Sequence, residues 1–194
     1  MSDAPFLDPP WNAELDVPAA LAVITPDAAL SGMFFLALVD GAKRRNVTLA
    51  GARERYLPFG FYPIAEFAPL LLAAARLFYP TRSLRHALRA LGHAGPAAFL
   101  GSTLGKVTLG SAVGVQGAIE AFAKTYALNV RPSQCSVKRA TAASCVVELR
   151  NVQYFLDSHH VGAFEGILDY AAVKGLVRIA ALSPVSADLL VEWG

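Results

Sequence analysis

The polar stretch Asp157-Ser158-His159-His160 is the richest candidate for chemistry in this chain, and Glu165 follows it closely. A neutral imidazole can accept or donate a proton near pH 7, and Asp157 could orient one as in a carboxylate–histidine pair. If His160 begins a helix, the two histidines point about 100° apart, so that one of them could face a cavity while Glu165 points elsewhere. The alternative is that Asp157 or Ser158 caps the helix and the histidines lie at the surface.

No other pattern of residues carries a catalytic or metal-binding signature. Cys135 and Cys145 lack the spacing of a metal site, and we expect reduced thiols that could face each other across a hairpin. The stretch 101–106 lacks the Gly-Lys-Ser/Thr end that a phosphate-binding loop requires. The sequence therefore predicts neither a metal nor a cofactor.

The basic residues are too few to indicate a nucleic-acid partner, since the net charge is +2. The run Lys43-Arg44-Arg45 follows an apolar segment and is typical of a solvated helix end, with a phosphate site as the alternative. Arg82, Arg85 and Arg89 form a second cluster, which could be a weak anion-binding face or a solvated one.

Hydrophobic residues make up 55% of the chain and charged residues 16%, and the mean hydropathy is +0.43. A membrane span needs about 20 apolar residues in a row, but the run from Met33 to Val39 is closed by Asp40. The N-terminus has no basic region of a secretory signal. We expect a cytoplasmic protein without a membrane span, whose excess hydrophobicity reflects an internal apolar cavity or an apolar partner face such as a homodimer interface.

The elements that must position these residues follow from periodicity. Apolar residues at helical spacing predict helices, over 27–45, 63–79, 83–91, 96–109, 117–128 and 159–172. Alternation predicts strands, over 130–139, 143–150, 176–182 and 187–193. This order is typical of an α+β fold, in which helices cover one antiparallel sheet. We expect residues 1–26 to be an irregular segment and residues 27–194 to form a single domain.

The sequence also predicts how two of these helices begin or end and how a third packs. Asp27 is the expected N-cap of the first helix, and Gly92 is expected to end the third. Gly162 and Gly166 lie four residues apart, so the last helix could press its backbone against a sheet.

Several stretches of the chain resemble one family in their order and spacing. They are Ser31-Gly32-Met33-Phe34-Phe35, Tyr62-Pro63-Ile64, Leu77-Phe78-Tyr79-Pro80, Leu88-Arg89-Ala90-Leu91-Gly92, Phe99-Leu100 with Ser102 and Gly105-Lys106, and Val161-Gly162-Ala163-Phe164-Glu165-Gly166-Ile167-Leu168. Together they resemble the myxobacterial paralogous domain family of unknown function over residues 27–193. That resemblance implies no activity.

The architecture also resembles a larger superfamily, which includes haem–nitric-oxide sensor domains, four-vinyl-reductase-type sensor domains and TRAPP transport subunits. This resemblance implies an apolar ligand held between helices and sheet. The haem branch uses a tyrosine-serine-arginine motif spaced by single residues, and this chain lacks it. The four-vinyl-reductase branch has cysteines near its end, whereas the last cysteine here is Cys145.

We predict a ligand-binding or regulatory module that holds an apolar small molecule in a cavity between helices and sheet. The residues expected to contact the ligand are Tyr62, Phe67, Tyr126, His160, Phe164 and Glu165. The alternative is a small cofactor-independent enzyme of the isomerase or cyclase type, with acid–base catalysis by His159, His160 and Asp157.

Overall fold

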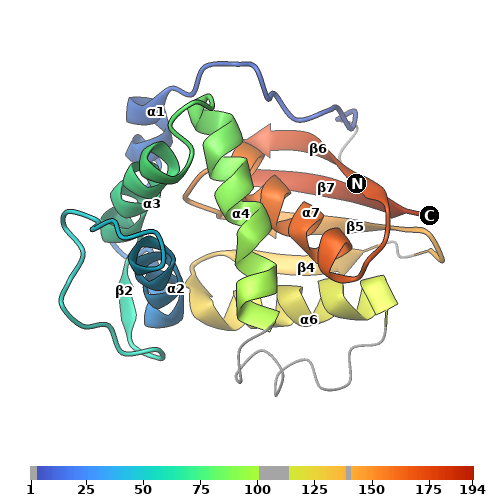
Figure 1. The fold of residues 1–194 in the computed structure, drawn as a ribbon. Coiled ribbons are helices and arrows are strands. Elements are labelled where there is room, and N and C mark those ends of the chain that lie inside the picture. The colour runs from blue at the N-terminus through green and yellow to red at the C-terminus, as the bar shows by residue number, and fades with distance from the viewer. Residues whose placement is uncertain (1–3, 101–113, 139–140) are drawn as a thin grey trace.

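The computed structural model describes residues 4–100, 114–138 and 141–194, and it combines a helical half with a four-stranded sheet (Figure 1). The helices are α1 (Val17–Ala22), α2 (Gly32–Lys43), α3 (Ile64–Phe78), α4 (Leu84–Leu100), α6 (Gly114–Asn129) and α7 (Val161–Tyr170), with the π-helical turn η1 (Leu156–His160). The strands are β1 (Ala29–Ser31), β2 (Phe61–Pro63), β3 (Val130–Arg131), β4 (Gln134–Lys138), β5 (Ser144–Arg150), β6 (Gly175–Ser183) and β7 (Ser186–Trp193).

The main sheet has the order β4-β5-β7-β6 with antiparallel neighbours throughout. In β5 the side chains of Cys145, Val147 and Leu149 are buried and alternate with half-buried ones, as period-2 patterning predicts. Helix α7 packs on this sheet and α4 packs on α7 (Figure 1). The predicted α+β fold class is confirmed.

The predicted start of the first long helix is wrong. Residues 29–31 form strand β1 of a small second sheet, in which all three pair with β2 and the first two also pair with β3. Helix α2 therefore begins at Gly32 rather than at Asp27. The predicted strand over 130–139 is also divided, into β3 and β4. The gap between these strands holds the cis peptide bond Arg131–Pro132.

Glycines bring α4 into direct backbone contact with η1 and α7. A Cβ atom on Gly92 would overlap the carbonyl oxygen of His159, and one on Gly162 would overlap the carbonyl oxygen of Arg89. Gly166 meets the carbonyl oxygen of His93 in the same way. The prediction that α7 uses its glycines against the sheet is therefore wrong, because they face α4.

Gly92 also does not end a helix, contrary to the prediction. Helix α4 continues through Gly92 and Pro96 to Leu100, so the boundary expected between 91 and 96 is absent. Most of the helix expected over 96–109 lies outside the described residues.

The two cysteines do not face each other. The register pairs Cys135 with Leu149 and Cys145 with Val191, and both thiols are buried and free. Burial raises the pKa of Cys135 to about 12 and that of Cys145 to about 11, so both are protonated at neutral pH.

The N-terminal segment lies across α4 and the edge of the main sheet (Figure 1). Leu7 forms an antiparallel bridge with Ile179 of β6, and the guanidinium of Arg89 lies 3.1 Å from the ring centroid of Trp11. Helix α1 forms within the segment that was expected to be irregular. Among the described residues, no helix has the length and apolar character that crossing a membrane requires.

Candidate functional site

A cavity of about 390 Å³ lies between α2, α3, α4, α6 and η1. Most of its wall is apolar, and the residues that form this wall include Met33, Phe34, Leu36, Ala37, Phe67, Leu71, Leu91, Phe122 and Ala163. The volume lies within the range of small-molecule sites, which are mainly apolar with a few placed polar groups. Its polar groups gather at two ends, which differ in charge.

The inner end carries a hydrogen-bonded tyrosine–histidine pair. Tyr126 Oη lies 2.8 Å from His160 Nε2, and His160 Nδ1 lies 3.5 Å from the carbonyl oxygen of Phe155. A carbonyl only accepts hydrogen bonds, so the ring proton is on Nδ1 and Nε2 accepts from the tyrosine hydroxyl. The pair thereby holds a neutral imidazole in one tautomer and orientation.

The π-helical turn explains why both histidines reach the cavity. Phe155 has a φ of 42°, in the left-handed region, and directly precedes η1. The backbone N–H of His160 then lies 3.4 Å from the carbonyl oxygen of Phe155, five residues back. Such a turn changes the angle between successive side chains, and π-helical turns occur frequently at functional sites. Both His159 and His160 line the cavity, whereas helical spacing led us to expect one.

The inner end is polar but uncharged. Burial lowers the pKa of His160 to about 4, and burial together with the neighbouring His160 lowers that of His159 to about 3. Burial also raises the pKa of Tyr126 well above its usual value. Among the described residues, the buried hydroxyl of Thr125 and Nδ1 of His159 have no hydrogen-bond partner.

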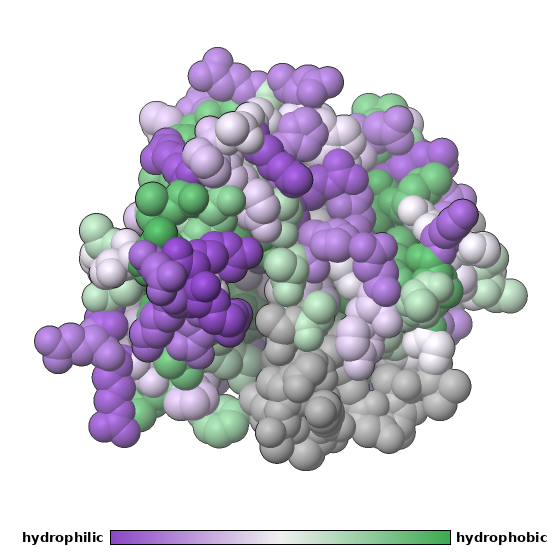
Figure 2. All heavy atoms as spheres, viewed as in Figure 1, coloured by the Kyte–Doolittle hydropathy of each residue, from purple (hydrophilic) through white to green (hydrophobic). Residues whose placement is uncertain are grey.

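The outer end of the cavity is charged and faces solvent. Its exposed lining residues come from the end of α2 and from α4, and include Asp40, Arg44, Arg45, Ala94 and Gly95. Figure 2 shows hydrophilic side chains gathered over this end of α2, beside a paler surface toward α4. We call Asp40, Arg44 and Arg45 the mouth of the cavity.

The two arginines of the mouth are held differently. The guanidinium of Arg45 lies 4.5 Å from the ring centroid of Phe78, and its Nη1 donates to the carbonyl oxygen of Gly41 at 3.1 Å. Arg44 makes no ion pair with a described carboxylate, and the Asp40 carboxylate lies 3.7 Å from Lys43 Nζ. The sequence led us to expect a solvated helix end here, and the tertiary contact with α3 and α4 is what places these arginines at a cavity.

Three of the six residues predicted to contact a ligand line the cavity, namely Phe67, Tyr126 and His160. Tyr62 does not, because its ring packs at 5.5 Å from Phe35, which in turn packs against Phe67 of the cavity wall. Phe164 is fully buried, with its ring centroid 5.3 Å from that of Phe122.

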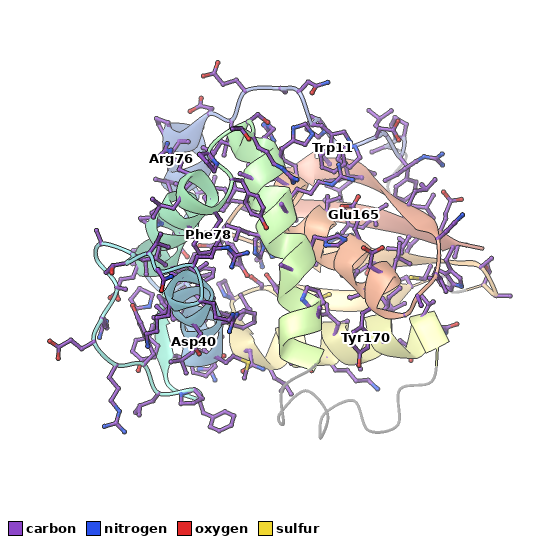
Figure 3. The ribbon with its side chains drawn as sticks, viewed as in Figure 1. Trp11, Asp40, Arg76, Phe78, Glu165 and Tyr170 are labelled. Carbon is purple, nitrogen blue, oxygen red and sulfur yellow. The ribbon has the colours of Figure 1, made fainter. Side chains whose placement is uncertain are left out.

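Glu165 lies on the other side of α4 from the cavity, where it forms an ion pair with Arg89. Figure 3 shows Glu165 beside α4 on α7, whereas Asp40 and Phe78 lie on the opposite side of α4. The open groove along this outer face is lined by charged side chains, and His93 pairs with Asp169 there at 2.8 Å. It has no enclosed apolar wall comparable with that of the cavity.

The structure does not bring Asp157 to the histidines. Its carboxylate forms an ion pair with Arg85 of α4. The carboxylate–histidine pair expected from the sequence is therefore absent. Arg85 and Arg89, expected to be a solvated or weakly anion-binding face, instead tie α4 to η1 and α7. Among the described residues, no cluster of three histidine, cysteine or acidic side chains could hold a metal ion.

A family model described as "Protein of unknown function (DUF2378)" matches residues 23–194. No curated protein matches the chain by sequence. Solved structures do match in fold. An H-NOX protein from S. oneidensis in the Fe(II)NO ligation state has a TM-score of 0.67 at 10% identity, covering 85% of this chain and 99% of that chain.

Two further H-NOX structures are similar. The unliganded Fe(II) protein from K. algicida has a TM-score of 0.63 at 11% identity, covering 85% of this chain and 97% of that chain. An oxygen-binding H-NOX domain related to soluble guanylate cyclases has a TM-score of 0.60 at 10% identity, covering 84% of this chain and 92% of that chain. At such identities the likeness shows a shared fold, and it confirms the predicted architecture.

The cavity does not fit the haem group that the fold implies. Both ring nitrogens of His160 are engaged, by Tyr126 and by the carbonyl of Phe155, so neither is free to ligate iron. Nδ1 of His159 has no hydrogen-bond partner among the described residues, but it is buried. The propionate-binding motif of the haem branch is also missing from the sequence.

Proposed function

This chain belongs to the family of proteins of unknown function whose model matches residues 23–194, and we propose that it is a non-catalytic ligand-binding or regulatory module. The ligand is a small molecule with a substantial apolar part, held in the cavity between the helices. The observation that carries the proposal is the apolar wall of this cavity, closed at its inner end by uncharged polar groups. Open apolar surface of this kind is costly in water unless something occupies it.

The alternative of an acid–base enzyme has less support. Asp157 pairs with Arg85 and cannot orient either histidine. With pKa values of about 3 and about 4, His159 and His160 are weak bases at neutral pH. The proposal therefore assigns them to binding rather than to proton transfer.

The test is a calorimetric titration with decan-1-ol, a neutral apolar probe, against the wild type and Ala37→Phe. Ala37 lies on the cavity wall in the middle of α2 and is exposed, so a phenylalanine there occupies ligand space without disturbing the buried core. Ala65→Phe is the matched control, since Ala65 is exposed on α3 away from the cavity.

We expect decan-1-ol to bind the wild type and Ala65→Phe, and Ala37→Phe to lose most of that affinity. A hundredfold excess over Kd should raise the melting temperature of the wild type by about 5–10 °C. Equal binding by both variants would place the probe outside the cavity, and no binding to the wild type would contradict the proposal.

Two predictions about the whole protein belong to this proposal as well. A homodimer would cover apolar surface outside the cavity, and light scattering of the purified protein would detect it. A cytoplasmic location remains a prediction that localisation of the tagged protein would check.

A further inference from the structure

We infer that the ligand is a single-chain amphiphile with an anionic end, whose apolar chain fills the cavity and whose carboxylate or phosphate lies at Arg44. This inference rests on the proposed function and names its ligand class. The inference is based on the charged side chains of the cavity, which are unevenly distributed along it.

All charged side chains on the described lining lie at the mouth, and they are Asp40, Arg44 and Arg45. The carboxylate of Asp40 is already next to Lys43. The guanidinium of Arg45 is fixed by Phe78 and by the carbonyl oxygen of Gly41. Arg44 is exposed and has no described carboxylate partner, so the mouth has an excess of positive charge and one guanidinium available.

The rest of the cavity can hold only an uncharged part of the ligand. Its wall is apolar apart from the uncharged polar groups of the inner end, and the hydrogen-bonding capacity of the His160 ring is taken by Tyr126 and Phe155. An unpaired charge moved into such surroundings loses its hydration without compensation. A charged group of the ligand must therefore remain at the mouth, with the apolar chain directed inward.

The sign and shape of the charged group follow from the arginine. A guanidinium presents a planar set of N–H donors that matches the oxygens of a carboxylate or a phosphate. A cationic amphiphile would meet the excess positive charge of the mouth. A neutral one would leave the guanidinium of Arg44 without a function in binding.

The experiment compares decanoate, decyl phosphate and decan-1-ol, which share one chain and differ in the headgroup. Each is titrated by calorimetry into the wild type, Arg44→Gln and Arg76→Gln at low ionic strength. Arg76→Gln is the matched control because it removes the same charge at a different place. Arg76 is exposed on α3 and does not line the cavity. Melting temperatures without ligand establish that all three proteins are folded.

We expect at least one anionic probe to bind the wild type about tenfold more tightly than decan-1-ol, as a partly exposed charge-assisted contact supports. Arg44→Gln should lose this preference while binding decan-1-ol as before, and Arg76→Gln should keep it. The tighter of the two anionic probes identifies the headgroup. Added salt should reduce the preference, because the mouth faces solvent.

The possible failures are distinguishable. Equal affinity of the wild type for all three probes would overturn the anionic end while leaving the proposed function intact. An undiminished preference in Arg44→Gln would overturn the assignment to Arg44. Absence of binding by any probe would overturn both proposals.

Discussion

Tyr126 and His160 define the chemistry of the inner cavity because each satisfies the other. The tyrosine hydroxyl donates to Nε2 at 2.8 Å, and both side chains are almost fully buried. A buried acceptor without a donor costs the full desolvation of that group, so this hydrogen bond matters more for stability than an exposed one. It also keeps both groups from acting as a free acid, base or metal ligand.

Replacing Tyr126 by phenylalanine tests this interpretation. The variant leaves Nε2 of His160 without a donor, and we expect the free energy of unfolding to fall by about 1–3 kcal/mol. Urea unfolding at pH 7 measures the change. Tyr170→Phe is the control, because Tyr170 is 52% exposed and should unfold like the wild type. A Tyr126→Phe variant as stable as the wild type would contradict the interpretation.

The lowered pKa values of the two histidines predict a pH dependence of stability. In the unfolded chain a histidine titrates near 6.5, whereas in the folded protein the pKa values are about 3 and about 4. Between these limits the unfolded state binds more protons, so the stabilisation is complete above about pH 6.5 and is lost as pH falls toward 4.

At pH 5 each histidine should reduce the free energy of unfolding by about 2 kcal/mol relative to pH 7. Urea unfolding at several pH values measures this slope, and His160→Gln should show a smaller one than the wild type. Identical slopes for the two proteins would show that His160 is not buried in its neutral form.

The sequence predicted some of these residues and not others for a physical reason. Phe67 and Tyr126 lie at regularly spaced positions of helices α3 and α6, which were predicted, whereas His160 lies in the π-helical turn η1, which was not. Asp157 and Glu165 were misassigned because their arginine partners lie 72 and 76 residues earlier in the chain. Local spacing contains no information about such distant partners.

At the scale of elements, the contact of α4 with η1 and α7 determines where both histidines point. Backbones approach this closely only where a residue has no Cβ atom, and Gly92, Gly162 and Gly166 provide that on the two sides of the contact. The His159 carbonyl lies directly against Gly92. Backbone packing thus holds the histidine-bearing turn, together with the ion pair between Arg85 and Asp157.

Gly92 and Gly95, which both lie in α4, give a matched test of this packing. Gly92→Ala places a methyl group into the His159 carbonyl, and we expect a loss of about 1–3 kcal/mol in stability from overpacking. A Cβ on Gly95 meets no atom of the described residues within 4 Å, so Gly95→Ala should stabilise the helix by about 0.5–1 kcal/mol. Thermal unfolding compares them, and changes of the same sign would contradict the packing described.

Gly92 also explains why the boundaries of helix α4 were predicted wrongly. In an isolated sequence, glycine after an apolar helical pattern is a typical helix end. Here the contact with His159 gives Gly92 its role, and α4 continues through it. Strands β5, β6 and β7 of the main sheet were predicted well because burial on one face produces alternation within each strand, which needs no knowledge of its neighbours. The register that separates Cys135 from Cys145 depends on pairing between strands and could not be read from either strand.

At the scale of the molecule, the chain shares its fold with H-NOX proteins at about 10% identity, while the cavity it encloses has its own chemistry. Neutral, hydrogen-bonded side chains occupy the inner end and arginines the mouth. The excess of hydrophobic residues in the sequence indicated a cavity or an apolar interface without locating either. The cavity lies where α2, α3, α4, α6 and η1 come together, and these elements are distant in the sequence.

The most direct measurement is a crystal structure of the wild-type protein grown with saturating decanoate. We expect electron density for the alkyl chain between α2, α3 and α4, ending near His160, with the carboxylate at the guanidinium of Arg44. Density for decanoate in the outer groove between α4 and α7, or a cavity that contains only water, would contradict it.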